Sequence, residues 1–239
     1  MDIPEIGAAP NDEPESRYSR VPPLKRLFDI SFAVLLLIPG IPLMAIISVV
    51  VLVRDGRPVI YSSPRVNSPA GSFQLFKFRT MDIDRSGPEI GVSGGDKRHR
   101  ITKLGRFLRK SRLDELPQLF NVLRGDMSFV GPRPPAPRYV RKFPETYSEV
   151  LQCRTGITGL ATVIFHAHEE WLLRDTKTAR QTERIYMRRC VPRKARLDLM
   201  YRDNWSLGLD IYLIYLTAGK LLPLPGKRLK RLKAKAKRV

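Results

Sequence analysis

Two adjacent carboxylates, Asp114 and Glu115, are the residues of this 239-residue chain whose type and position best suit chemistry. Pro117 follows closely, where the first turn of a helix tolerates proline, and apolar residues then recur at helical spacing up to Gly125. The sequence therefore predicts that both acids lie at the positive end of a short helix. That end also suits a phosphate, because its first N–H groups lack intrahelical partners. Taken alone, the pair could equally be ordinary first-turn acids that favour the helix dipole.

Basic side chains crowd both sides of the acid pair, which is more than a helix start requires. They are Arg106, Arg109, Lys110 and Arg112 before the pair, and Arg124 and Arg133 after it. Arg133 belongs to a Gly-Pro-Arg-Pro-Pro run that predicts a rigid turn. A guanidinium held on such a turn could bind a phosphate through two hydrogen bonds at little entropic cost. The pattern favours a site for a phosphorylated substrate.

A second pair of cations comes from a segment upstream. Residues 73–79 alternate well enough to predict a strand, which places Lys77 and Arg79 on the same face as Phe73 and Leu75. Cations aligned in this way could meet a diphosphate. The alternative is a solvated strand face with no ligand.

Several motifs, in order along the chain, carry a resemblance to a known family. They are Lys25-Arg26-Leu27-Phe28-Asp29, Lys77-Phe78-Arg79-Thr80-Met81, Leu104-Gly105-Arg106-Phe107-Leu108-Arg109, Gly156-Ile157-Thr158-Gly159-Leu160 and Asn204-Trp205-Ser206-Leu207. Together with the run LDELPQLFNVLRGDMSFVGPRP, they make the chain resemble the bacterial sugar transferases. These are small monotopic phosphoglycosyl transferases, which move a sugar phosphate from a nucleotide sugar onto a polyprenyl phosphate. The resemblance covers about residues 24 to 217.

The resemblance implies roles for the acids and for part of the basic set. A carboxylate can attack a phosphoryl group when the phosphate charge is neutralised. Asp114 is then expected to attack a UDP-sugar, release UMP and carry a phosphosugar-aspartyl intermediate that the polyprenyl phosphate attacks. Glu115 is expected to share Mg²⁺ with Asp114 or to manage the acceptor's proton. The phosphate-binding residues are expected to be Lys77, Arg79, Arg106, Arg112 and Arg133.

The chain departs from the family's pattern after the Gly156-Ile157-Thr158-Gly159 motif, which itself predicts a turn whose glycines allow close backbone approach. The family usually has Gln near Thr162 and a polar loop where this chain has residues 164–170. That segment contains His166, His168, Glu169 and Glu170. Alternating histidines without a further ligand pair are typical of surface or pocket residues, so we do not predict a metal site there.

Composition points to an anionic partner. The net charge is +20 and the pI about 10.5, which allows nucleic acid, anionic lipid or phosphorylated substrates. No DNA-binding or RNA-binding motif or aromatic stacking array is present, so we expect no nucleic acid. Cys153 and Cys190 have neither disulfide-framework nor zinc-site spacing, which fits a reducing cytosolic face.

The N-terminal region predicts membrane attachment. Residues 1–23 read as a disordered leader without signal-peptide features. Residues 27–53 are long enough to cross a bilayer of about 30 Å, but Pro39, Gly40 and Pro42 interrupt the middle, and basic residues flank both ends. We therefore predict a re-entrant hairpin over residues 24–57. A kinked single span and a buried core hairpin are the alternatives.

The remaining residues predict one catalytic domain, 58–222, followed by a basic tail, 223–239. We expect a compact α/β, mostly helical fold on the cytosolic side, with amphipathic helices at the membrane. Thr102 is a plausible N-cap for a helix ending near Lys110, and residues 171–203 and 211–222 also favour helices. Residues 82–100 favour a mobile loop with His99 at its surface. The tail suits anionic lipids.

The resemblance implies a place at the cytoplasmic face of a bacterial inner membrane, with a UDP-sugar donor and a polyprenyl phosphate acceptor, and the basic tail adds anionic lipids as expected partners. Whether it forms a homodimer stays open at this point. Two other functions also stay open. One is a basic membrane adaptor in which both acids are dispensable, and the other is a membrane-bound phosphoester hydrolase.

Overall fold

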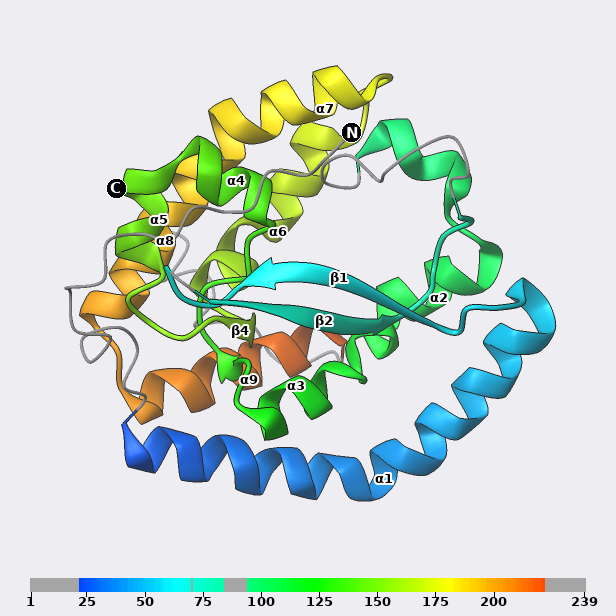
Figure 1. Ribbon diagram of the computed structural model, residues 1–239, viewed down its shortest axis with the longest axis horizontal. Helices are drawn as coiled ribbons and strands as arrows, with labels where there is room; N and C mark the ends of the chain where they lie inside the picture. The colour runs from blue at the N-terminus through cyan, green and yellow to red at the C-terminus, as the bar shows by residue number, and fades with distance from the viewer. Residues whose placement is uncertain (1–21, 70, 84–93, 222–239) are drawn as a thin grey trace, which may run out of the picture.

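A computed structural model describes residues 22–69, 71–83 and 94–221. The predicted leader up to residue 21, the predicted basic tail and most of the predicted loop at 82–100 lie outside the described residues. Figure 1 shows a long helix, α1 (Pro23–Asp55), along the edge of the molecule, with two small sheets and the other helices packed on one side of it. The prediction of a mostly helical α/β fold is confirmed.

Helix α1 is apolar over almost its whole circumference. It buries one stripe against the rest of the protein, at Lys25, Asp29, Ala33, Leu37, Gly40, Met44, Ile47 and Val51. Large apolar side chains elsewhere on it, such as Leu27, Ile38 and Val53, are exposed. Among the described residues, α1 is the one helix long and apolar enough to cross a membrane. A surface of this kind indicates contact with lipid.

The sequence led us to expect a hairpin interrupted at Pro39, Gly40 and Pro42. The structure has no interruption at this segment. Both prolines lie inside one continuous helix. Each proline removes a single N–H donor and pushes against the preceding turn, so a helix can accommodate it by bending. Figure 1 shows the bend, after which the second half of α1 turns away from the line of the first half.

Two small sheets lie at the centre of the molecule. Strands β1 (Ile60–Val66) and β2 (Ser72–Phe78) form an antiparallel hairpin, which confirms the strand predicted at 73–79. Strands β3 (Ser128–Val130) and β4 (Gly156–Thr158) pair in parallel. The turn predicted at Gly156 is therefore wrong, because this segment is a strand. A Cβ on Gly156 would lie 2.3 Å from the backbone nitrogen of Gly131, so glycine is needed for backbone packing.

Short helices surround these sheets. The 3-10 helix η2 (Gly95–Arg100) leads to α2 (Lys103–Ser111), the 3-10 helix η3 (Leu113–Glu115) and α3 (Gln118–Arg124). Helices α4 (Pro137–Lys142) and α5 (Pro144–Val150) lie between β3 and β4. The Thr102 hydroxyl accepts a hydrogen bond from the Gly105 N–H at 2.8 Å, so the predicted N-cap is confirmed. His99 is exposed, as predicted.

After β4 the described chain forms helices joined by short turns. It contains α6 (Leu160–Leu173), α7 (Ala179–Ile185), the π-helical turn η4 (Tyr186–Cys190), α8 (Val191–Asp203) and α9 (Leu207–Leu221). The helices predicted over 171–203 and 211–222 are thus confirmed within the described residues. Their apolar sides share a core with α1, α3 and β3, in which Leu119, Val130, Tyr201 and Leu213 are buried.

A buried polar cluster fastens the start of α1 to this core. Lys25 Nζ lies 2.5 Å from Asp210 Oδ2 on α9 and donates to the Val130 carbonyl at 3.1 Å. Asp210 also accepts from the Tyr201 hydroxyl at 2.7 Å and from Trp205 Nε1 at 3.1 Å. Both atoms of the ion pair are hidden from solvent, since the side chains are 6% and 0% exposed. This cluster fixes the path of α1 across the domain.

Candidate active site

The acid pair lies in the 3-10 turn η3, directly before α3, as the position of Pro117 predicted. The turn begins at Arg112, which adopts a left-handed conformation with φ 59°. That conformation is unfavourable for a side chain with a Cβ, and strain of this kind gathers at functional sites. It ends α2 and redirects the chain into η3, which packs against both α2 and β2.

Glu115 is held between two arginines. Its Oε2 accepts from Arg112 Nη1 at 3.0 Å and its Oε1 accepts from Arg133 Nη2 at 2.9 Å. Burial alone would raise the pKa of Glu115, but Arg133 and Arg112 outweigh burial and hold that pKa below its ordinary value. Glu115 is therefore a permanent carboxylate that fixes the positions of both guanidinium groups.

Asp114 has a different environment. Its residue is 7% exposed, and its Oδ1 is buried with no hydrogen-bond partner among the described residues. Burial, with a contribution from Glu115, raises the pKa of Asp114 to about 6, although Lys77, Arg109 and Arg133 oppose the shift. A buried carboxylate oxygen without a partner is costly in a folded protein. It is also what a nucleophile or a metal ligand needs, because no hydrogen bond has to be broken before it reacts.

Cations from separate elements act on the acid turn. Lys77 from β2 and Arg109 from α2 act on the charge of Asp114, and Arg65 from β1 acts on that of Lys77. Burial, together with the positive charges of Arg109, Arg65 and Arg133, lowers the pKa of Lys77 to about 8. Burial and Arg133 likewise lower the pKa of Arg65, whose Nε has no hydrogen-bond partner. Buried positive charges that lie close together repel one another, so an anionic ligand would stabilise these cations.

The structure brings together Lys77, Arg112 and Arg133 with the acids, but it places two predicted phosphate ligands elsewhere. Arg79 follows the end of β2, and its Nη2 donates to the carbonyls of Asp55 and Gly56, the latter at 2.7 Å. It caps the C-terminal end of α1, where unpaired carbonyls favour a cation. Arg106 is exposed on the solvent side of α2. The sequence analysis placed Arg79 on the same strand face as Lys77. That placement fails because the strand ends at Phe78.

Two site residues were missed by sequence reasoning. Arg109 was noted only as one of the flanking cations. Helical spacing could have shown that Arg109 faces the protein and Arg106 does not, because the buried residues Gly105 and Leu108 mark the inner side of α2. Its Nε donates to Thr80 Oγ1 at 2.8 Å. Arg65 carries no such signal, because it comes near Lys77 only through the pairing of β1 with β2, in which Arg65 lies opposite Phe73.

A cavity of about 300 Å³ opens between α1 and the acid turn. Its walls are mostly apolar, with Arg112 and Glu115 at one end. The lining residues include Leu36, Pro39, Gly40, Leu43, Leu116, Phe129, Ile157, Thr158, Thr162 and Thr217. The proline-containing bend of α1 therefore forms one wall of a cavity that reaches the ion-paired Glu115.

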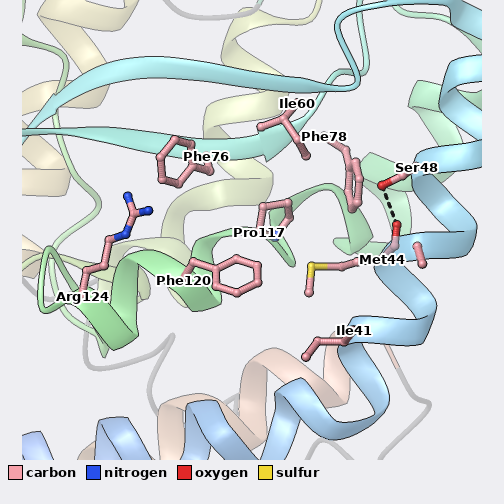
Figure 2. Close-up of a pocket in the computed structure, with 10 residues that line it drawn as sticks. Ile41, Met44, Ser48, Ile60, Phe76, Phe78, Pro117, Phe120 and Arg124 are labelled. Atoms are coloured by element: carbon pink, nitrogen blue, oxygen red, sulfur yellow. Dashed lines mark hydrogen bonds between the residues drawn. The ribbon is translucent and has the colours of Figure 1, made fainter.

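A second cavity, of about 330 Å³, lies on the other side of Pro117. Figure 2 shows it enclosed by the second half of α1, the β1–β2 hairpin and α3, with Phe78, Phe120 and Met44 turned into it. Arg124 approaches its rim, over the ring of Phe76. Neither acid lines this second cavity, so the first cavity is the one connected to the site.

The histidine-containing segment lies on α6 and not in a loop. His166 Nε2 is 3.6 Å from Glu170 Oε1, His168 contacts Arg193, and Glu169 pairs with Lys194 at 3.1 Å. Within the described residues no group of three His, Cys, Asp or Glu side chains could hold a metal ion.

The candidate site thus combines a buried acid pair, several cations and an apolar cavity beside a hydrophobic helix. Comparison with known proteins gives the class. The chain belongs to the bacterial sugar transferase family, whose model matches residues 20–223. The resemblance inferred from the motifs is therefore confirmed.

Three relatives illustrate the similarity. The chain is 36% identical over 199 residues to the undecaprenyl-phosphate glucose phosphotransferase of Komagataeibacter xylinus, covering 81% of this chain and 35% of that protein. It is 36% identical to the uncharacterized sugar transferase EpsL of Bacillus subtilis, covering 83% and 87%. It is 34% identical to the UDP-glucose:undecaprenyl-phosphate glucose-1-phosphate transferase of Caulobacter vibrioides, covering 83% and 69%. The chain thus spans about a third of the first relative and most of the second.

Proposed function

We propose that this chain transfers a sugar 1-phosphate from a UDP-sugar to undecaprenyl phosphate at the cytoplasmic face of a bacterial inner membrane. The observation that carries the proposal is the unpartnered, buried Oδ1 of Asp114 among cations that outnumber the acids. Such a group neutralises a diphosphate and leaves one carboxylate oxygen available for attack. Family membership and the activities for which two relatives are named support the same reaction.

In the first step, a carboxylate oxygen of Asp114 bonds to the phosphorus next to the sugar. The bond from that phosphorus to the oxygen shared with UMP breaks, and UMP leaves with the bonding electrons. Lys77, Arg109 and Arg133 stabilise the charge that develops on the phosphoryl oxygens. The product on the protein is a phosphosugar-aspartyl ester.

In the second step, a phosphate oxygen of the lipid acceptor bonds to the same phosphorus. The bond from phosphorus to Asp114 breaks, which restores the carboxylate and yields undecaprenyl diphosphate sugar. Glu115 stays ionised and holds Arg112 and Arg133 in place for both steps. Division into two steps avoids direct contact between two anionic substrates in one transition state.

A Mg²⁺ ion fits these residues. This ion typically uses one or two protein carboxylates together with substrate phosphate oxygens and water. Asp114 offers an oxygen without a partner, whereas both oxygens of Glu115 already accept from arginines, so Asp114 is the residue that would hold the ion. When bound, Mg²⁺ would supply further neutralisation of the diphosphate charge.

The proposed membrane geometry follows from α1. The helix would enter the bilayer from the cytosolic side with its bend at Pro39 and Pro42, and would return to that side at the basic Arg54. The cavity beside the bend would then admit the prenyl chain from the bilayer, and its phosphate would reach Arg112. A soluble donor and a lipid acceptor could thus meet at one surface.

The test is UMP release from a panel of UDP-sugars by the full chain in nanodiscs, with and without undecaprenyl phosphate and Mg²⁺. We expect sustained release that needs both additions, and a loss of at least about a thousandfold in Asp114→Asn. Asp126→Asn, which removes an acid from the loop after α3, is the matched control. Sustained release of UMP and free sugar phosphate without the lipid would favour a hydrolase. Absence of Asp114-dependent release with every donor would favour the non-catalytic adaptor.

A further inference from the structure

One side of α6 presents polar groups next to the acid turn. Thr162, His166 and Glu170 recur every four residues, so they lie on one side of the helix, which we call the α6 polar face. Thr162 lines the cavity that also contains Arg112 and Glu115. His166 lies one turn further along, a rise of about 6 Å. Figure 1 shows α6 rising from β4 on the side away from α1, so successive turns of α6 lie farther from α1.

His166 is close to the arginines that hold Glu115. Burial lowers the pKa of His166, Glu170 opposes this shift, and Arg112 and Arg133 reinforce it. Its ring is therefore neutral at cytosolic pH and carries one hydrogen-bond donor and one acceptor. The side chain is 40% exposed and that of Glu170 is 70% exposed, so a soluble ligand can reach both.

Neighbouring contacts hold α6 in place. Lys194 on α8 donates to both oxygens of Glu169, at 3.2 and 3.1 Å, and lies over the ring of Tyr186. The Glu169–Lys194 pair is shielded from solvent, with side chains 17% and 16% exposed. The charge of Glu169 also acts on Arg133, which places this part of α6 beside the active-site cations. A polar face on a supported helix can orient a ligand with little loss of entropy.

We propose that the α6 polar face binds the sugar ring of the nucleotide-sugar donor through its hydroxyl groups, with His166 as the main specificity-determining residue. The inference rests on the proposed function. The cations around Asp114 take the diphosphate, and the apolar cavity beside α1 suits the prenyl chain. Within the described residues, α6 adds further polar groups beside this cavity, beginning with Thr162, which lines it together with Arg112 and Glu115. A neutral imidazole and a carboxylate match neutral sugars, whose hydroxyls both donate and accept hydrogen bonds.

The same helix offers a matched control. His168 is two residues from His166 but faces another way, with its ring against Phe165 and Trp171 and its Nε2 3.3 Å from Arg193. Substitution of either histidine removes the same group from the same helix. A general loss of helix stability would therefore affect both variants, whereas loss of a sugar contact would affect only His166→Ala.

The experiment compares the wild-type chain, His166→Ala, His166→Gln and His168→Ala in nanodiscs with UDP-glucose, UDP-galactose and their N-acetylated counterparts. We expect His166→Ala to lower kcat/KM for the best donor by about tenfold to a hundredfold, mainly through KM, and to reduce discrimination between epimers to about threefold. His166→Gln should recover part of this loss. Inhibition by UMP, which lacks the sugar, should change by less than about twofold, and His168→Ala should behave like the wild type.

Different results contradict the inference and the proposed function. An equal loss of kcat/KM with every donor in His166→Ala would overturn the sugar site, and so would equal effects in His166→Ala and His168→Ala. Neither result would contradict the proposed transferase function. A wild-type chain that uses all four donors equally well would also overturn it. If the wild-type chain releases UMP from none of the donors, the proposed function itself fails.

Discussion

Two regions of this protein each combine buried carboxylates with cations, yet they differ in how completely the charges are paired. At the Lys25–Asp210 cluster, both oxygens of Asp210 accept hydrogen bonds and the lysine is bonded to the carboxylate and to a backbone carbonyl. At the acid turn, Asp114 keeps an oxygen without a partner, and several cations repel one another around it.

The difference separates a structural site from a reactive one. A fully paired buried cluster has nothing left to offer a ligand, and its contribution is to fix the position of α1. At the acid turn the positive charges are balanced only when an anionic ligand is present. Protein stability is therefore expected to respond in opposite directions when a carboxylate is neutralised in each region.

The largest effect should come from breaking the paired cluster. Asp210→Asn leaves Lys25 as a buried charge without its counter-ion, and we expect a loss of about 3–5 kcal/mol in the free energy of unfolding. Urea denaturation in detergent, followed by tryptophan fluorescence, would measure it. The double variant Lys25→Met/Asp210→Leu should regain most of the loss because no charge stays buried. A change below about 1 kcal/mol in Asp210→Asn would contradict the structural role.

At the acid turn the opposite sign is expected. The pKa of Asp114 rises from 3.8 to about 6 on folding, so the folded state disfavours the ionised form. The resulting loss of stability is absent below about pH 4, grows as pH rises, and is complete above about pH 6. Asp114→Asn should therefore stabilise the protein by up to about 3 kcal/mol at pH 8.

The same denaturation assay at pH 8, 6 and 4.5 would check this prediction. The stabilisation by Asp114→Asn should shrink as pH falls. A destabilised Asp114→Asn protein at pH 8 would show that the carboxylate is satisfied in the folded state, and the contrast between the two regions would disappear.

Two arginines three residues apart on α2 test which cations belong to the unpaired group. Arg109→Gln should lower kcat/KM by about tenfold to a hundredfold, because Arg109 acts on Asp114 and Lys77. Arg106→Gln should change it by less than about twofold, since its side chain faces solvent. Steady-state UMP release with a saturating lipid acceptor measures both. A larger effect at Arg106 would restore the assignment made from the sequence.

The pH dependence of turnover tests the ionisation of Asp114 and Lys77 at the acid turn. Asp114 must be ionised to attack, so kcat/KM for the donor should fall about tenfold per pH unit below about pH 6. Lys77 must be protonated to bind phosphate, so kcat/KM should also fall above about pH 8. In Lys77→Arg the alkaline limb should move to higher pH, because guanidinium stays charged. A flat profile between pH 5 and 7 would exclude Asp114 as the group that titrates.

Much of the site could be predicted from local patterns. Pro117 and Gly125 correctly bounded the short helix that follows the acids, and Thr102 correctly marked the start of α2. Predictions failed for a residue just beyond the end of a strand and for a segment whose partner is distant in the sequence. Arg79 lies one residue beyond β2 and caps α1, and Gly156 belongs to a strand whose partner is 28 residues away in the sequence at Ser128. The interruption at Pro39 is a bend and not a break.

The sequence by itself determined which residue types are available, which of them share a helix or strand face, and that a long apolar segment precedes an acid pair flanked by cations. Only the tertiary structure decided which cations reach Asp114. Lys77 comes from β2, Arg109 from α2 and Arg133 from the loop after β3. Arg106 and Arg79 are excluded although they belong to the same motifs as Arg109 and Lys77. The physical reason is that spacing fixes directions within one element, whereas the approach of different elements depends on long-range packing and on the burial that sets the pKa values of Asp114 and Lys77.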